Sequence, residues 1–77
     1  MEQRLQLAEE GVGLAGIEEA TALTRSSWAG NKDYFLRRYN YIVGKVRREA
    51  RAKRILQREK RYLLQNLKEM YKDVMND

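Results

Sequence analysis

Apolar side chains recur at helical spacing from Phe35 to Val74, and the chain contains no proline. If Phe35 is counted as position d of a heptad, positions a, d and e are mostly apolar almost to the C-terminus. A stripe this persistent is typical of a helix surface that packs against other helices. Gly44 is the only glycine after Asn31. We therefore predict an all-α fold in which residues 32–75 form one long amphipathic helix.

A helix stop followed by a helix start is indicated at Gly30-Asn31. Glycine readily takes the left-handed conformation that ends a helix, and asparagine is a preferred N-cap. Asp33 then falls in the first turn, where a negative charge suits the helix dipole. These signals predict an αα-hairpin within a single domain, residues 1–77, in which a Gly- and Ala-rich N-terminal arm, residues 1–30, precedes the long helix.

The N-terminal arm shows weaker helical signals of its own. Leu5, Leu7 and Ala8 suggest a short helix that ends at Gly11. Further along the arm, one helix face is expected to carry the larger side chains, namely Leu14, Ile17, Thr21, Thr24 and Trp28.

The long-helix interpretation leaves part of the apolar stripe without cover. A helix over residues 32–75 is about 66 Å long, whereas the 30-residue arm reaches about 45 Å at most. An exposed apolar stripe of that size usually marks a partner. We therefore predict self-association, as a homo-oligomer or a larger assembly, through Phe35, Tyr39, Ile42, Val46, Leu56, Leu63, Leu64, Leu67, Met70, Tyr71 and Val74.

A second interpretation starts from the polar residues that interrupt the stripe. Glu49, Lys53 and Lys60 occupy a or d positions, so packing is expected to be weakest in the middle. A kink near Gly44 or within residues 47–54 would fold the chain back and bring the two apolar ends together as a three-helix bundle. We favour the uninterrupted helix because neither glycine nor proline follows Gly44.

Basic side chains are concentrated in mid-chain. The net charge is +5, but residues 47–61 carry eight basic and two acidic side chains, and residues 1–31 have a net charge of −3. Steps of four, three, four and three place five arginines on one face of a helix: Arg47, Arg51, Arg54, Arg58 and Arg61. Such a face is often simply solvated. Here no carboxylate shares it, and arginine is suited to bidentate phosphate contacts, so we expect a polyanionic partner.

These features predict a non-enzymatic assembly or interaction protein that docks on nucleic acid, such as a small structural or packaging-associated protein of a virus or mobile element. The predicted phosphate contacts are Arg47, Arg51, Arg54, Arg58 and Arg61, with Arg37, Lys68 and Lys72 as outlying contacts. The alternative is a protein-binding regulator or inhibitor whose basic helix face contacts an acidic protein surface. Membrane-surface binding is disfavoured because Ala50 and Ala52 are the only apolar residues between Arg47 and Arg54.

Catalytic, metal and cofactor chemistry has little support in the sequence. Histidine and cysteine are absent, which removes the usual general base, thiolate nucleophile and zinc ligands. Residues 11–16 match the G-x-G-x-x-G pattern, but no strand precedes them, so no dinucleotide site is expected. The start lacks an apolar targeting segment and no uncharged run is long enough to span a membrane. We expect a protein of the cytoplasm or of a particle assembled there.

Overall fold

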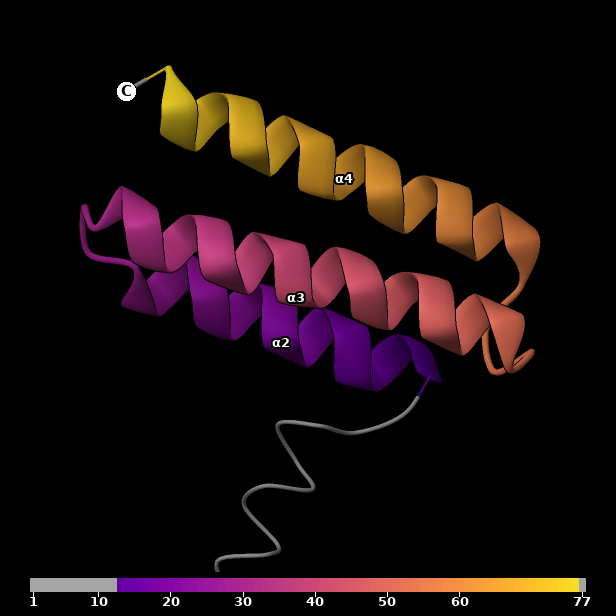
Figure 1. The fold of residues 1–77 in the computed structure, drawn as a ribbon. Coiled ribbons are helices and arrows are strands. Elements are labelled where there is room, and N and C mark those ends of the chain that lie inside the picture. Colours follow the sequence, from indigo (N-terminus) through magenta and orange to yellow (C-terminus); the bar gives the residue numbers. More distant parts are fainter. Residues whose placement is uncertain (1–12, 77) are drawn as a thin grey trace, which may run out of the picture.

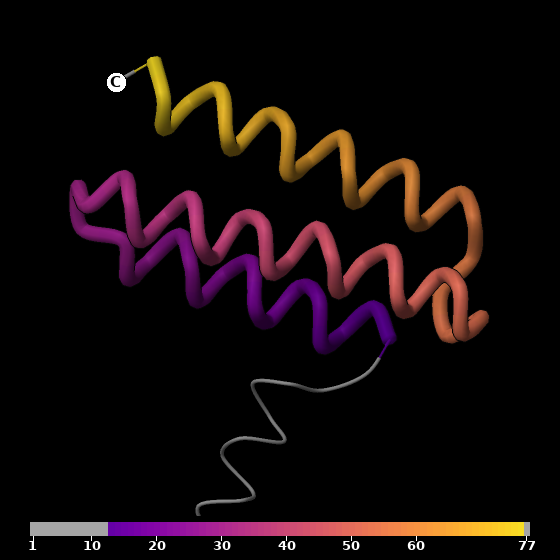
Figure 2. Tube along the Cα trace, viewed as in Figure 1, coloured from indigo at the N-terminus to yellow at the C-terminus, as the bar shows by residue number. Residues whose placement is uncertain are grey.

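The computed structural model describes residues 13–76, which form three helices and no strand (Figure 1). Helix α2 spans Gly13–Ser27, α3 spans Lys32–Arg51 and α4 spans Gln57–Met75. Both α2 and α4 pack against α3. The trace in Figure 2 shows that each helix runs opposite to the one before it, so α2 and α4 both begin at the end of the bundle where α3 finishes. The all-α prediction is confirmed, and the short helix predicted before Gly11 lies outside the described residues.

The junction between α2 and α3 follows the predicted signals. Gly30 is left-handed, with φ of +80°, and Ala29 before it is also left-handed, with φ of +48°. Asn31 is extended, and its side-chain oxygen accepts a 3.0 Å hydrogen bond from the backbone N–H of Tyr34. Asp33 lies in the first turn of α3, as expected. One local set of residues therefore ends α2 and begins α3.

The prediction of one helix over residues 32–75 was wrong, because α3 ends at Arg51 and α4 begins at Gln57. The backbone N–H of Lys53 donates to the carbonyl of Ala50 at 3.0 Å, and that of Arg54 donates to Glu49 at 2.9 Å. These paired bonds make a Schellman motif, in which Lys53, with φ of +62°, takes the position usually held by glycine. The long helix was predicted because no glycine or proline follows Gly44, but the helix ends here without either residue. Gly44 lies within the continuous α3.

The fold-back arrangement is favoured by burial of the apolar stripe within one chain. Core side chains come from all three helices and the α3–α4 turn: Ile17, Ala20, Phe35, Ile42, Val46, Ala50, Ile55, Leu63, Leu67, Met70 and Val74. Burying one large apolar side chain contributes about 1.5–3 kcal/mol, so the four from α4 contribute about 6–12 kcal/mol. A left-handed lysine costs about 1–2 kcal/mol. The gain exceeds the cost, and the second interpretation of the sequence is the one that the structure shows.

Most of the residues predicted for self-association instead pack against other residues of the same chain. Seven are buried in the core, namely Phe35, Ile42, Val46, Leu63, Leu67, Met70 and Val74, and three are half-buried against it, namely Tyr39, Leu64 and Tyr71. Leu56 is the exception, with 54% of its surface exposed. The uncovered stripe that motivated the prediction is therefore absent from this fold, and self-association itself stays a prediction.

Helix α2 buries the face that its sequence predicts. Ile17 and Thr24 are fully buried, and Leu14, Thr21 and Trp28 are partly buried. The hydroxyl of Thr24 donates to the carbonyl of Ala20 at 2.9 Å and accepts a 3.1 Å bond from Nε of Arg38 on α3. A series of aromatic contacts runs from Trp28 in the α2–α3 turn through Phe35 and Tyr39 of α3 to Tyr71 of α4. Within residues 13–76, no helix combines the length and apolar character needed to cross a membrane.

Replacing Lys53 with glycine is expected to stabilise the protein. The substitution removes about 1–2 kcal/mol of left-handed strain and adds about 0.5–1 kcal/mol of unfolded-state entropy, for a net gain of roughly 0.5–1 kcal/mol. The midpoint of urea unfolding measures the change. Lys53→Ala is the matched control, because it removes the same side chain and keeps the strained backbone. Equal midpoints for the glycine and alanine variants would contradict the role assigned to this turn.

Candidate nucleic-acid interface

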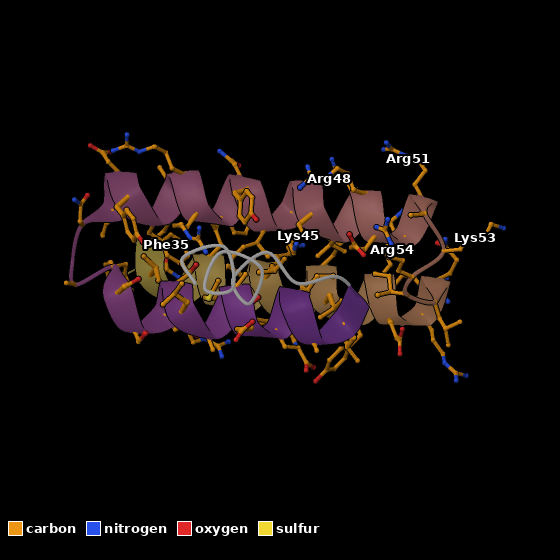
Figure 3. All side chains as sticks on the ribbon, turned by 90° about the horizontal axis from the view of Figure 1, so that it is seen from below. Phe35, Lys45, Arg48, Arg51, Lys53 and Arg54 are labelled. Atoms are coloured by element: carbon orange, nitrogen blue, oxygen red, sulfur yellow. The ribbon has the colours of Figure 1, made fainter. Side chains whose placement is uncertain are left out.

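The basic mid-chain segment folds into one end of the bundle. Residues 47–61 form the last part of α3, the α3–α4 turn and the first part of α4. We call the cationic residues of this segment the basic end: Arg47, Arg48, Arg51, Lys53, Arg54, Arg58, Lys60 and Arg61. Figure 3 shows Arg51 and Lys53 extending outward from this end, whereas Arg54 lies against the bundle. The fold therefore places these eight cations at one end of the bundle.

A buried carboxylate organises the basic end from within. Glu49 is only 5% exposed. Its Oε1 accepts a 2.9 Å hydrogen bond from the backbone N–H of Gly13, the first residue of α2, and its Oε2 accepts a 3.0 Å bond from Nη1 of Arg54. Glu49 thus joins the start of α2, the end of α3 and the α3–α4 turn. From the sequence, Glu49 was interpreted only as an interruption of the apolar stripe. A carboxylate at a buried position is rarely found without a partner, so its place in the stripe could have indicated a buried ion pair.

The environment of Glu49 keeps it ionised. The pKa of its carboxyl group lies below the ordinary value, mainly because the N–H of Gly13 donates to the charged form. Burial acts in the opposite direction, while the hydrogen bond and charge of Arg54 and the charge of Lys45 lower the pKa further. A carboxylate at the N-terminus of α2 also interacts favourably with the helix dipole. The charged carboxylate therefore stabilises the contact of α3 with the start of α2 and with the α3–α4 turn.

The other carboxylate of the segment also serves the backbone. Oε1 of Glu59 accepts a 2.9 Å bond from the backbone N–H of Leu56, which precedes α4. With Glu49 and Glu59 both engaged, seven cations of the basic end have no ion-pair partner among residues 13–76: Arg47, Arg48, Arg51, Lys53, Arg58, Lys60 and Arg61. The charge left at this end is strongly positive.

Helix dipoles add to that charge. The positive ends of α2 and α4 both lie at the basic end. Arg48 and Arg51 suit the last turn of α3, but Arg58 and Arg61 lie close to the start of α4, where cations are disfavoured. Repulsion among these charges lowers stability in the absence of a counter-charge. An anionic partner would relieve it.

The five arginines of the predicted stripe reach one end of the bundle but do not form one continuous face. Arg47 and Arg51 lie on α3 and Arg58 and Arg61 on α4, while Arg54 in the turn is held by Glu49. The stripe required an unbroken helix, and the turn at residues 52–56 divides it. Sequence reasoning also missed three cations of the basic end because they lie off the heptad positions of the stripe: Arg48, Lys53 and Lys60.

The outlying cations of the predicted site lie apart from this end. Arg37 is in the first half of α3, fourteen residues before Arg51, which corresponds to about 21 Å along the helix. Lys72 is in the last turn of α4, at the opposite end of the bundle, and Lys68 lies between. Two groups of cations on one molecule provide a natural comparison for experiment.

Residues 13–76 contain no group of acidic side chains gathered closely enough to hold a metal ion. Comparison with known protein families, curated proteins and solved structures finds no match to this chain.

Glu49→Gln is expected to destabilise the fold by about 1.5–3 kcal/mol, the range for hydrogen bonds to a charged group. Because the folded-state pKa is lowered, the stabilisation by Glu49 is present above the ordinary glutamate value of about 4.3 and is lost as the pH falls toward the lowered value. Urea unfolding from pH 7 to pH 3 measures the difference between the two proteins. It should shrink on acidification, and the exposed Glu19→Gln should show little effect at any pH. A Glu49→Gln protein as stable as wild type at pH 7 would exclude this role.

Proposed function

We propose that this protein is a non-enzymatic nucleic-acid-binding domain that docks its basic end on the phosphate backbone. One observation carries the proposal. Seven cations gather at one end without an ion-pair partner among residues 13–76, while the two nearby carboxylates are engaged by the backbone. A surface kept cationic at a cost to stability is typical of proteins that neutralise phosphates.

The mode of binding follows from the residue types at the basic end. Most of the cations are arginines, whose planar guanidinium groups contact phosphate oxygens in pairs. Contacts to the backbone position a protein on nucleic acid but carry little sequence information. We therefore propose weakly selective binding. A packaging-associated role in a virus or mobile element, as inferred from the sequence, would use binding of this kind.

The salt dependence of binding tests the proposal. With about five phosphate contacts, the logarithm of the association constant for duplex DNA or RNA should fall with the logarithm of salt concentration at a slope of about −4 to −5. Arg51→Glu combined with Arg58→Glu takes one contact from each helix of the basic end. This variant should bind at least about tenfold more weakly, and its slope should be smaller by about two.

Arg37→Glu combined with Lys72→Glu is the matched control, because it changes the net charge equally at the far end of the bundle. Its affinity should change much less than that of the Arg51/Arg58 variant. Fluorescence anisotropy with labelled nucleic acid measures both, and circular dichroism verifies that each variant is folded. Binding that is insensitive to salt, or an equal loss in the two variants, is incompatible with a site at the basic end.

One observation favours a second function, the binding of an acidic protein surface. Leu56 is 54% exposed in the α3–α4 turn, between Arg54 and Arg58 in the sequence. A phosphate backbone offers little to an exposed leucine, whereas a protein surface offers an apolar contact among acidic residues. The basic end would then supply the rim of a protein interface.

Leu56→Gln separates the two functions, because it removes the apolar contact and leaves every charge in place. Nucleic-acid affinity of this variant should equal that of wild type if the first proposal is right. Affinity capture from nuclease-treated lysate, with wild type and Leu56→Gln compared side by side, tests the second. A partner retained by wild type after nuclease and lost by Leu56→Gln would favour the protein interface over nucleic acid.

A further inference from the structure

A groove opens between α2 and α4. The two helices begin together at the basic end and run in the same direction, each packed on α3 (Figure 2). The groove between them has a volume of about 180 Å³. Its lining includes Glu18 and Arg25 of α2, Tyr62 and Asn66 of α4, and the buried Leu63 and Leu67. It therefore combines apolar and polar side chains in one depression.

Tyr62 differs from the other tyrosines of the chain, all of which the structure describes. The hydroxyl of Tyr34 lies 3.4 Å from Ser27 Oγ, the rings of Tyr39 and Tyr71 are 5.0 Å apart, and Arg38 lies over the ring of Tyr41. Tyr62 has no such contact within residues 13–76, and 62% of its surface is exposed. An exposed aromatic ring at a groove is a surface on which a flat ligand can stack.

The sequence of α4 places this ring beside the basic end. Arg58 and Asn66 lie four residues before and after Tyr62, so the three share a helix face. Arg61 immediately precedes Tyr62. Along α4, Arg58 and Arg61 can therefore contact phosphates, and the ring of Tyr62 can stack on a base. Asn66 follows, with an amide that can donate and accept hydrogen bonds.

We propose that the groove receives an unpaired base of single-stranded nucleic acid, stacked on Tyr62, while Arg58 and Arg61 contact the flanking phosphates. This inference rests on the proposed function and specifies its substrate. Proteins that bind single strands combine a cationic track with aromatic stacking platforms, which is the combination found here. In a duplex the bases are paired and stacked, and exposing one has an energetic cost.

The opposite wall of the groove supports a base as the occupant. Glu18 of α2 carries a carboxylate, which repels a phosphate but accepts hydrogen bonds from the amino groups on base edges. Arg25 lies seven residues farther along α2, away from the basic end. Phosphates are therefore expected at the basic end, and a base is expected in the groove.

Tyr62→Ala tests the inference, with Tyr62→Phe as the matched control that keeps the ring. Affinity is measured by fluorescence anisotropy for labelled single-stranded RNA and DNA and for a duplex of the same length. Loss of one stacked base should weaken single-strand binding of Tyr62→Ala by about 5- to 150-fold. Duplex binding should be unchanged, Tyr62→Phe should resemble wild type, and the salt slope should be the same because no charge is removed.

Distinct outcomes separate this inference from the proposal on which it rests. If wild type binds nucleic acid and Tyr62→Ala binds single strands equally well, the groove has no role in binding a base and only the basic end stands. If wild type binds neither single strands nor duplex, the proposed function itself is wrong. Sedimentation equilibrium provides a third test: self-association of wild type that Tyr62→Ala abolishes would show that a second copy fills the groove, and would overturn the inference.

Discussion

The buried carboxylate of Glu49 joins the three segments that meet at the basic end. Its two oxygens bind the first N–H of α2 and the guanidinium of Arg54, groups that are 36 residues before it and five residues after it. A buried charge is stable only when it is paired and hydrogen-bonded, so this contact fixes the geometry of three segments together. Because each helix runs opposite to the one before it, α2 and α4 begin at the end where α3 finishes, and Glu49 lies at this end. The basic end lies there, and the lining of the groove begins at Glu18 and Tyr62, the sixth residue of α2 and of α4.

Stability and charge conflict at the basic end. A fold selected only for stability would place carboxylates among its arginines, as surface helices commonly do. Here both carboxylates of residues 47–61 accept bonds from backbone N–H groups, and only Glu49 also pairs with an arginine, Arg54. The lysine of the α3–α4 turn adopts a left-handed conformation that glycine would adopt at lower cost. Departures from local rules at one place on a molecule are commonly associated with function. Both departures lie at the basic end, which favours this surface as the functional one.

The sequence predicted the helix cap and the buried helix face correctly, but it did not predict where the chain turns back on itself. The cap at Asn31 and the buried face of α2 follow from residue type and spacing, and both are confirmed. The break after Arg51 was missed because the same heptad register applies on both sides of the turn: the buried apolar residues of α3 and α4 fall on positions a, d and e. Only within the turn does the pattern fail, since Ile55 is buried and Leu56 is exposed. What selects the break is non-local burial, which spacing along the chain does not reveal. The exposure of Tyr62 agrees with its position outside the apolar stripe, whereas its place at a groove depends on how α2 lies relative to α4.

The change from a rod to a bundle alters the expected target. A straight helix of about 66 Å with arginines along one side would follow a long stretch of backbone. The folded chain instead presents its cations across the ends of two adjacent helices, a width of about 20 Å, which corresponds to roughly six phosphates of one strand. So short a contact provides limited affinity through charge alone at physiological salt. An aromatic ring next to the cations would add an interaction that salt does not screen, and Tyr62 occupies that position.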